Sequence, residues 1–166
     1  PHERLLYRGR WKDGLVPGDV SIASSLLEID KFFDLIEKYK AFVLPNGSAL
    51  FNLPMGEEVF SDEARKLDQQ TFASFLQEQG FHSPELRWYV DYCCRDDYGG
   101  NTDQISAYAG LHYFCSRKGH AGNAAGDEVL TWEEGNYFLV KKLREDVLKC
   151  IRSHSMVVKV VEEDGG

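Results

Sequence analysis

Apolar residues recur at helical spacing in several stretches of the chain, and this pattern predicts a mainly helical protein. The first such stretch is SSLLEIDKFFDLIEKYK, residues 24–40, in which Ser25 is a candidate N-cap. One amphipathic helix accounts for its spacing, because a single face would carry the recurring apolar residues Leu26, Ile29, Phe33 and Ile36.

A second helix is predicted in QQTFASFLQEQGF, residues 69–81. Asp68 stands directly before this stretch as a candidate cap, and Gly80 is placed to end the helix. The side chains expected to face the core are Phe72, Phe75 and Leu76.

Clear boundary signals surround LRWYVDYCCRDDYGG, residues 86–100, and predict a third helix. Ser83 is its candidate N-cap, Pro84 takes the first helical position, and the glycines of DYGG stop the helix. Thr102 is then predicted to cap a fourth helix, DQISAYAGLHYFCSR, residues 103–117.

The last part of the chain predicts a fifth helix, from about Asn136 to about Arg152, and then a strand at Met156–Val161. PNGSALFNLP, residues 45–54, has a turn dipeptide before a short apolar run and favours a brief strand or hairpin arm. The predicted fold class is therefore α+β and predominantly helical, with about five helices and a few short strands.

Composition narrows the classes of function. Hydrophobic residues make up 43% of the 166 residues and charged residues 28%, as in an ordinary soluble globular protein. The formal net charge of -8 argues against a nucleic-acid partner, because phosphate contacts need a basic face. No run approaches the ~20 apolar residues of a membrane span. Both a cytoplasmic and an exported location are compatible with these features.

The four cysteines lack the C-x-x-C spacing of zinc and thioredoxin-type sites. Adjacent cysteines on a helix point about 100° apart, so Cys93 and Cys94 are poorly placed to share one tetrahedral ion. We expect both to be small buried residues in a helix that packs on most of its circumference. The other two are Cys115 and Cys150.

A thiol nucleophile is the alternative reading of the same region. Cys93 or Cys94 would act with His112 and a carboxylate, and these groups would have to meet in space. The candidate carboxylates are Asp91, Asp96 and Asp97. RDD, residues 95–97, fits equally well a helix-end charge network in which Arg95 pairs with a carboxylate.

Glycine motifs for phosphate binding are missing from the chain. GNAAGD, residues 122–127, lacks the G-x-G-x-x-G spacing, and no G-x-x-x-x-G-K-[ST] occurs, so the chain does not supply a complete nucleotide site. In TWEEGNYFLVKKL, residues 131–143, Gly135 and Asn136 fit either an ordinary turn and N-cap or backbone N–H groups that face a flavin or an anion.

Three stretches within residues 83–143 together carry a family resemblance: SPELRWYVDYCCRDDYG, ISAYAGLHYFCSRKG and VLTWEEGNYFLVKKL. They resemble a bacterial branch of the flavin-containing amine oxidase-like superfamily, the NAD(P)/FAD-dependent oxidoreductases with a Rossmann-like domain. RGRWKDGLVP, residues 8–17, is also similar to that branch. The resemblance implies an internal segment of a longer protein, with a helical substrate-domain-like region at 1–128 and an incomplete return to the FAD-binding domain at 129–166.

The resemblance also implies roles for individual residues. In the superfamily a glycine turn, a leucine-bearing helix and a V-x-x-V strand mark the return to the flavin domain, and the matching residues here are Gly135, Leu139, Leu143, Val157 and Val160. The implied FAD-contacting residues are Trp132, Gly135, Asn136 and Val157. The rings and charges expected around the substrate pocket are Trp88, Tyr89, Tyr92, Arg95, Asp96, Tyr108, His112 and Tyr113.

The longer protein implied by this resemblance would move a hydride from a C–H bond of a small-molecule substrate, such as one next to an amine, to FAD. A Rossmann-like domain missing from this chain would hold the FAD, while this segment would orient the substrate and exclude water. We expect neither flavin binding nor turnover from the isolated 166 residues. The alternative is a non-catalytic helical module that binds a ligand or a protein through the same aromatic surface.

Overall fold

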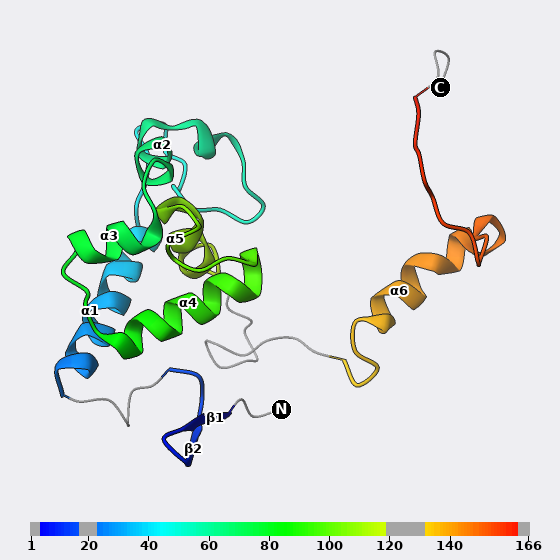
Figure 1. The fold of residues 1–166 in the computed structure, drawn as a ribbon. Helices are drawn as coiled ribbons and strands as arrows, with labels where there is room; N and C mark the ends of the chain where they lie inside the picture. The colour runs from blue at the N-terminus through cyan, green and yellow to red at the C-terminus, as the bar shows by residue number, and fades with distance from the viewer. Residues whose placement is uncertain (1–3, 17–22, 119–131, 163–166) are drawn as a thin grey trace. The chain divides into compact units, whose positions relative to one another are not determined.

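The computed structural model describes residues 4–16, 23–118 and 132–162. They belong to two compact units, Pro1–Gly119 and His120–Gly166, and each unit is described by itself. Figure 1 labels the helices and strands of both units. The domain boundary predicted between residues 128 and 129 lies outside the described residues.

The first unit begins with a hairpin of two short strands, β1 (Arg4–Tyr7) and β2 (Arg10–Asp13). The helical elements that follow are α1 (Ala23–Lys40), the 3-10 helix η1 (Glu57–Phe60), α2 (Asp62–Asp68), α3 (Phe72–Glu78), α4 (Pro84–Tyr98) and α5 (Ala107–Cys115). The second unit contains α6 (Tyr137–Arg144) and the 3-10 helix η2 (Glu145–Cys150). Six α-helices and one two-stranded sheet among the described residues confirm the predominantly helical α+β class.

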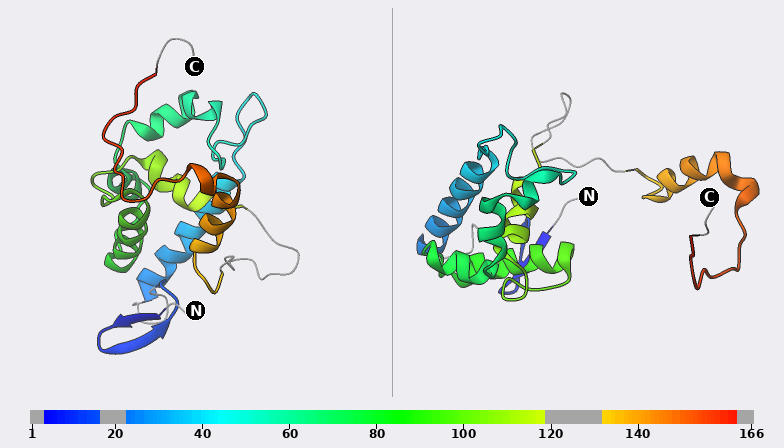
Figure 2. Two further views of the ribbon diagram at one scale, coloured as in Figure 1. Left: turned by 90° about the vertical axis from the view of Figure 1, so that its right-hand side faces the viewer. Right: turned by 90° about the horizontal axis from the view of Figure 1, so that it is seen from above.

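Helix α5 forms the centre of the first unit, because it packs against α1, α2, α3 and α4. Figure 2 shows these helices from two further sides. The apolar sequence of α5 allows burial on several faces, and its buried side chains include Ala107, Leu111, Phe114 and Cys115. Gly110 permits a close approach of α5 to α3, since a Cβ atom at this position would overlap the ring of Phe72.

The third predicted helix is confirmed together with both of its ends. Ser83 Oγ accepts a hydrogen bond from the Leu86 N–H, and Pro84 is the first helical residue of α4. Gly99 ends the helix in the left-handed conformation, with φ of 71°, which favours glycine. The expected burial of Cys93 and Cys94 is also confirmed.

Two other predicted caps are wrong. Thr71 rather than Asp68 caps α3, and Ser106 rather than Thr102 caps α5. Asp68 instead closes α2, a short helix that the apolar pattern did not reveal, and Thr102 is buried against Asp91 of α4. The predicted core residues of α3 are confirmed as Phe72, Phe75 and Leu76.

Hydrogen bonds join α1 and α4 near their N-terminal ends. We call the bonds made by Glu28, Ser25 and Glu85 the clasp. Glu28 Oε2 of α1 accepts hydrogen bonds from the backbone N–H groups of residues 82 and 83, both at 2.7 Å. In the other direction, Ser25 Oγ donates to Glu85 Oε2 of α4 at 3.0 Å. Ser25 is therefore a buried residue inside α1 and not its cap. Tyr7 of the hairpin donates to Glu85 Oε1 at 3.2 Å, which ties β1 to the same point.

The core-facing side of α1 is slightly rotated from the predicted one. Ile29 and Ile36 are buried as expected, but Phe32 rather than Phe33 is fully buried between them.

The strand predicted within residues 45–54 is not formed. One isolated bridge next to a turn takes its place, and the apolar run ends in Phe51, which is buried in the core. Core packing, rather than a sheet neighbour, accounts for this run.

In the second unit the fifth predicted helix is present as α6 followed by η2. No described side chain of this unit is buried. The strand predicted at Met156–Val161 is not formed, although Figure 1 shows this segment as an extended stretch of chain. A strand needs a neighbour for its backbone N–H and C=O groups, and the described residues of this unit include no other strand.

Candidate functional site around His112

His112 lies near the C-terminal end of α5 and faces the loop that follows Leu50. Its Nε2 lies 2.9 Å from the main-chain carbonyl oxygen of Asn52. A carbonyl oxygen only accepts hydrogen bonds, so Nε2 carries a proton in this contact. The imidazole also contacts the rings of Phe51 and Tyr108, with centroids 6.3 and 6.1 Å away. These contacts hold the imidazole in one orientation.

Glu58 is a buried carboxylate next to His112, with only 5% of its surface exposed. Its Oε1 accepts a hydrogen bond from the Gly56 N–H at 2.9 Å. This bond lowers the pKa of Glu58 despite the opposing effect of burial, and the Asn52 side chain and His112 act in the same direction. A larger residue at position 56 would force this carboxylate to shift, because a Cβ there would lie 2.8 Å from Glu58 Oε2. The carboxyl group is therefore ionised at neutral pH.

Tyr108 lies one turn before His112 on α5. Its hydroxyl donates to the Leu50 carbonyl at 3.3 Å, and burial, with the nearby charge of Glu58, raises its pKa to about 12. The phenol therefore stays protonated. We call the following four residues the His112 cluster: Asn52, Glu58, Tyr108 and His112. The cluster combines an ionised carboxylate, a neutral phenol and an imidazole with a defined proton position.

A shallow pocket of about 370 Å³ lies on the Glu58 side of the cluster. Its lining residues are Leu44, Asn46, Glu57, Glu58, Phe60 and Ser61. Phe60 is 68% exposed, and Leu53 and Met55 of the same loop are also exposed.

The residues predicted to surround a substrate fall into four places. Tyr108 and His112 meet in the His112 cluster. Trp88 and Tyr92 stack on each other along α4, with ring centroids 5.9 Å apart. The remaining rings, Tyr89 and Tyr113, pack against Phe114, and the charged Arg95 and Asp96 are exposed at the end of α4.

The cysteine region does not form a nucleophilic site in this structure. Burial raises the pKa of the Cys94 thiol to about 12, and it also raises the pKa of Cys93. Asp91, a proposed helper, accepts hydrogen bonds from Thr102, while His112 is bonded to Asn52. The buried thiols are Cys93, Cys94 and Cys115, whereas Cys150 is exposed.

The ion pair formed within residues 95–97 is not the predicted pair between Arg95 and a carboxylate. Asp97 pairs with Arg117 of the segment after α5, at 2.9 Å, and Arg95 makes no ion pair with a described residue. The guanidinium of Arg117 also lies over the Tyr113 ring, 4.0 Å from its centroid. This network fastens the C-terminal end of α4 to α5.

The residues implied to contact FAD belong to the second unit. Gly135 has φ of 65° and donates its N–H to the Trp132 carbonyl at 2.9 Å, which confirms a tight glycine turn before α6. Trp132 stacks on Phe138, with centroids 5.5 Å apart. Asn136 directly precedes α6, but its side chain makes no capping bond. Val157 is 77% exposed.

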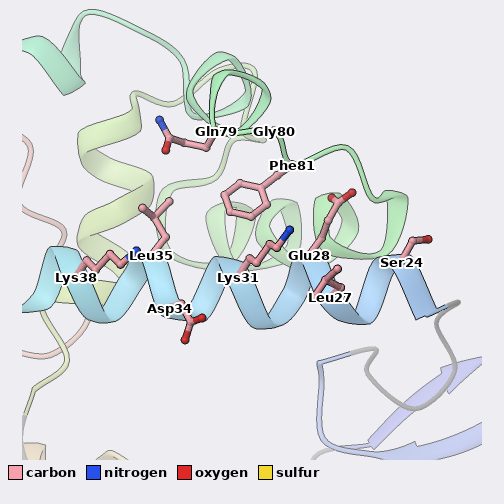
Figure 3. A pocket seen from close by; sticks show the side chains of 10 residues that line it. All are labelled: Ser24, Leu27, Glu28, Lys31, Asp34, Leu35, Lys38, Gln79, Gly80 and Phe81. Atoms are coloured by element: carbon pink, nitrogen blue, oxygen red, sulfur yellow. The ribbon is translucent and has the colours of Figure 1, made fainter.

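A second concave region, which the sequence patterns did not reveal, is a groove of about 540 Å³ along α1. Figure 3 shows Phe81 reaching toward α1 from the turn after α3, above Leu35 and Lys31. Lys31 and Lys38 line the groove and make no ion pair with a described residue. None of the predicted substrate-pocket residues lines this groove.

The sequence patterns did not reveal Asn52 or Glu58, because Asn52 lies in a loop and Glu58 in the short 3-10 helix η1, both far from α5 along the chain. Within the described ranges, no group of three or more His, Cys, Asp or Glu residues is arranged to hold a metal ion. No helix among the described residues is long and apolar enough to cross a membrane.

The comparisons with known proteins give no family for this chain. No family model matches it, and no curated protein or solved structure matches it.

Proposed function

We propose that this chain is the substrate-domain-like part of an FAD-dependent oxidoreductase of the amine oxidase-like kind. In this proposal the first unit shapes a pocket for a small-molecule substrate, and a Rossmann-like domain outside this chain holds the FAD. The isolated chain is then inactive, because it lacks a phosphate-binding glycine motif. The first support for this proposal is the family resemblance within residues 83–143, a range that includes α4, α5 and the turn before α6.

The observation that best supports the proposal is the exposed apolar surface of the second unit. Among residues 132–162 no side chain is buried, and Leu143 is 78% exposed. The run MVVKVV, residues 156–161, has four valines that are between 58% and 86% exposed. A nearly continuous β-branched run is typical of a strand that is covered on both faces in a parallel sheet. A Rossmann-like domain contains such a sheet.

The gene region that encodes this chain gives the first test. If the proposal is right, the upstream coding sequence contains a strand, a G-x-G-x-x-G turn and a helix, with an acidic residue about 20 positions later. The longer protein, once purified, should be yellow and should release FAD on denaturation. A colourless protein that takes up no added FAD would contradict the proposal.

A pair of variants of that longer protein tests the role given to the valine run. Val157→Asp should lower the amount of FAD retained, because a charge would enter a sheet covered on both faces. Arg152→Ala, at an exposed position just before the run, is the matched control and should retain FAD like the parent protein. Equal FAD content in both variants would argue against this placement of the strand.

The α1 groove favours a second candidate, a non-catalytic helical module that binds a protein or a small ligand. Its lining combines apolar Leu35 and Phe81 with Lys31 and Lys38, two cations that make no ion pair with a described residue. On this reading a partner binds the isolated chain without any flavin, and Leu35→Asp abolishes the binding. A flavin-containing longer protein whose activity is unchanged by Leu35→Asp would remove this candidate.

A further inference from the structure

The α1 groove follows the length of one helix. On α1 its lining residues run from Ser24 to Lys38, and residues 79–81 of the turn after α3 line its other side. A helix rises about 1.5 Å per residue, so these two ends of the groove are about 21 Å apart. The volume of about 540 Å³ is therefore spread along the helix. Such a shape suits a segment of polypeptide better than a compact molecule.

Apolar and cationic side chains alternate along the face of α1 that lines the groove. Four lining residues follow one another at steps of four, four and three positions, which places them one above another on the helix. In order along α1 they are Leu27, Lys31, Leu35 and Lys38. Leu27 is 55% exposed, so part of this apolar surface is open to a partner.

Phe81 forms an apolar wall on the other side of the groove. Its ring packs edge-on against the buried ring of Phe32 on α1, with centroids 5.9 Å apart. This contact with the core holds Phe81 in place. Figure 3 shows its ring above Lys31 and Leu35, so an occupant of the groove would meet an aromatic wall, an apolar side chain and a cation together.

The charges of the groove favour an anionic occupant. Lys31 and Lys38 are both exposed, and neither makes an ion pair with a described residue. Two carboxylates also line the groove. Glu28 already accepts hydrogen bonds from two backbone N–H groups just before α4, and Asp34 points away from Phe81 in Figure 3. An acidic group on the Phe81 side would therefore meet two available cations.

The spacing of the two lysines fits a helix better than an extended segment. Lys31 and Lys38 are seven positions apart, or about 10.5 Å along α1. Residues seven positions apart on a partner helix have the same spacing and share a face. On an extended segment the side chains of one face are about 6.6 or 13 Å apart, so a pair of acidic residues there matches the lysines less well. Leu35 lies between the lysines and fits an apolar residue between the two acidic ones.

We propose that the α1 groove binds an amphipathic helix of a partner protein, whose contacting face alternates acidic and apolar residues turn by turn. The acidic residues pair with Lys31 and Lys38, while the apolar residues pack on the two leucines and on Phe81. This docking site shares no residue with the His112 cluster or with the residues implied to contact FAD. It goes beyond the FAD proposal, and it names the partner for the groove of the second candidate function.

A synthetic peptide tests the chemistry of the partner on the 166-residue chain. The probe is a helix of about 14 residues, with glutamate and leucine alternating along one face and alanine and glutamine elsewhere. We expect it to shift the NMR amide signals of α1 and of residues 79–81. A counterpart with glutamine at each glutamate should bind about tenfold more weakly, and added salt should reduce this difference. Equal binding of the two peptides, no binding of either, or shifts centred outside the groove would refute the proposal.

Surface variants of the chain test the two cations. Lys31→Glu and Lys38→Glu should each weaken binding of the glutamate peptide by about three- to tenfold, because an attraction becomes a repulsion. Asp34→Asn removes an anion from the groove and should strengthen binding by about twofold. Lys66→Glu is the matched control, since it changes the net charge equally at an exposed position of α2 outside the groove. An equal loss of binding in Lys66→Glu would overturn the proposal, because net charge alone would then explain the effect.

A second copy of the chain is the other possible occupant, and sedimentation velocity of the free chain distinguishes it from a partner helix. We expect any self-association of the parent chain to be unchanged in Lys31→Glu, whose exposed side chain is not needed for folding. Self-association that this change abolishes would overturn the proposal and assign the groove to a second copy. Absence of flavin from the longer protein would refute the FAD function alone, because none of these measurements involves FAD.

Discussion

Asp91 connects α4 to the segment before α5, and its replacement should destabilise the first unit strongly. Its Oδ1 accepts two hydrogen bonds from Thr102, at 2.9 Å from the backbone N and 2.7 Å from Oγ1. Thr102 is fully buried, so Asp91→Ala leaves two buried donors without an acceptor. Each such donor costs about 1–3 kcal/mol. We therefore expect a loss of about 3–4 kcal/mol in the free energy of unfolding.

Urea unfolding followed by circular dichroism measures this loss, and the melting temperature should fall by roughly 10–15 °C. Asp91→Asn keeps a carbonyl acceptor and should cost much less than Asp91→Ala. Asp96→Ala, at an exposed position of the same helix, is the matched control and should stay within about 0.5 kcal/mol of the parent chain.

A double-mutant cycle isolates the hydroxyl contact. Thr102→Val removes one of the two donors, so combining it with Asp91→Ala should cost about 1–2 kcal/mol less than the sum of the two single changes. If Asp91→Ala is no more destabilising than Asp96→Ala, or if the two changes are simply additive, the pair does not hold α4 and α5 together as described.

Three further outcomes follow from the packing and the charges. Gly110→Ala should destabilise the first unit by about 1–3 kcal/mol because its methyl group would enter the Phe72 ring, whereas Gly100→Ala should be tolerated, since its Cβ would lie 3.4 Å from its nearest neighbours. The lowered pKa of Glu58 means that its contribution to stability is present above the usual value of 4.5 and is lost as the pH falls. The stability gap between the parent chain and Glu58→Gln, measured by urea unfolding, should therefore be largest near neutral pH and should close on acidification; a gap that widens in acid would contradict this sign. Iodoacetamide at neutral pH should label only Cys150 in the folded chain, detected by mass spectrometry, and early labelling of any buried thiol would contradict the packing of α4 and α5.

Local sequence signals were sufficient where neighbours along the chain set the structure. The boundaries of α4 follow from Ser83, Pro84 and Gly99, which act within one turn of each helix end. The caps of α3 and α5 were harder, because two candidate residues precede each helix. Thr102 was the wrong choice since its hydroxyl is bonded to Asp91 of another helix, and no local pattern reveals that contact.

The candidate site was predictable only in part for the same reason. His112 and Tyr108 share a helix face, and the family resemblance pointed to both of them. Asn52 and Glu58 lie about 50–60 residues earlier, in a loop and in the short 3-10 helix η1, whose positions depend on the packed core. The valine run at residues 156–161 shows the opposite case, because its β-propensity is clear but the described part of its unit offers no sheet to join.

The clasp between α1 and α4 leads us to expect an order of folding. Its hydrogen bonds join residues that are 54, 55 and 60 positions apart, and η1, α2 and α3 all lie inside the loop that it closes. Closing so long a loop costs entropy that the packed helices must offset, so we expect the clasp to form late. The hairpin bond from Tyr7 to Glu85 spans 78 positions and uses the same carboxylate, so we expect β1 and β2 to dock late as well. Hydrogen exchange at the amides of residues 82 and 83 would report the moment at which this unit becomes native.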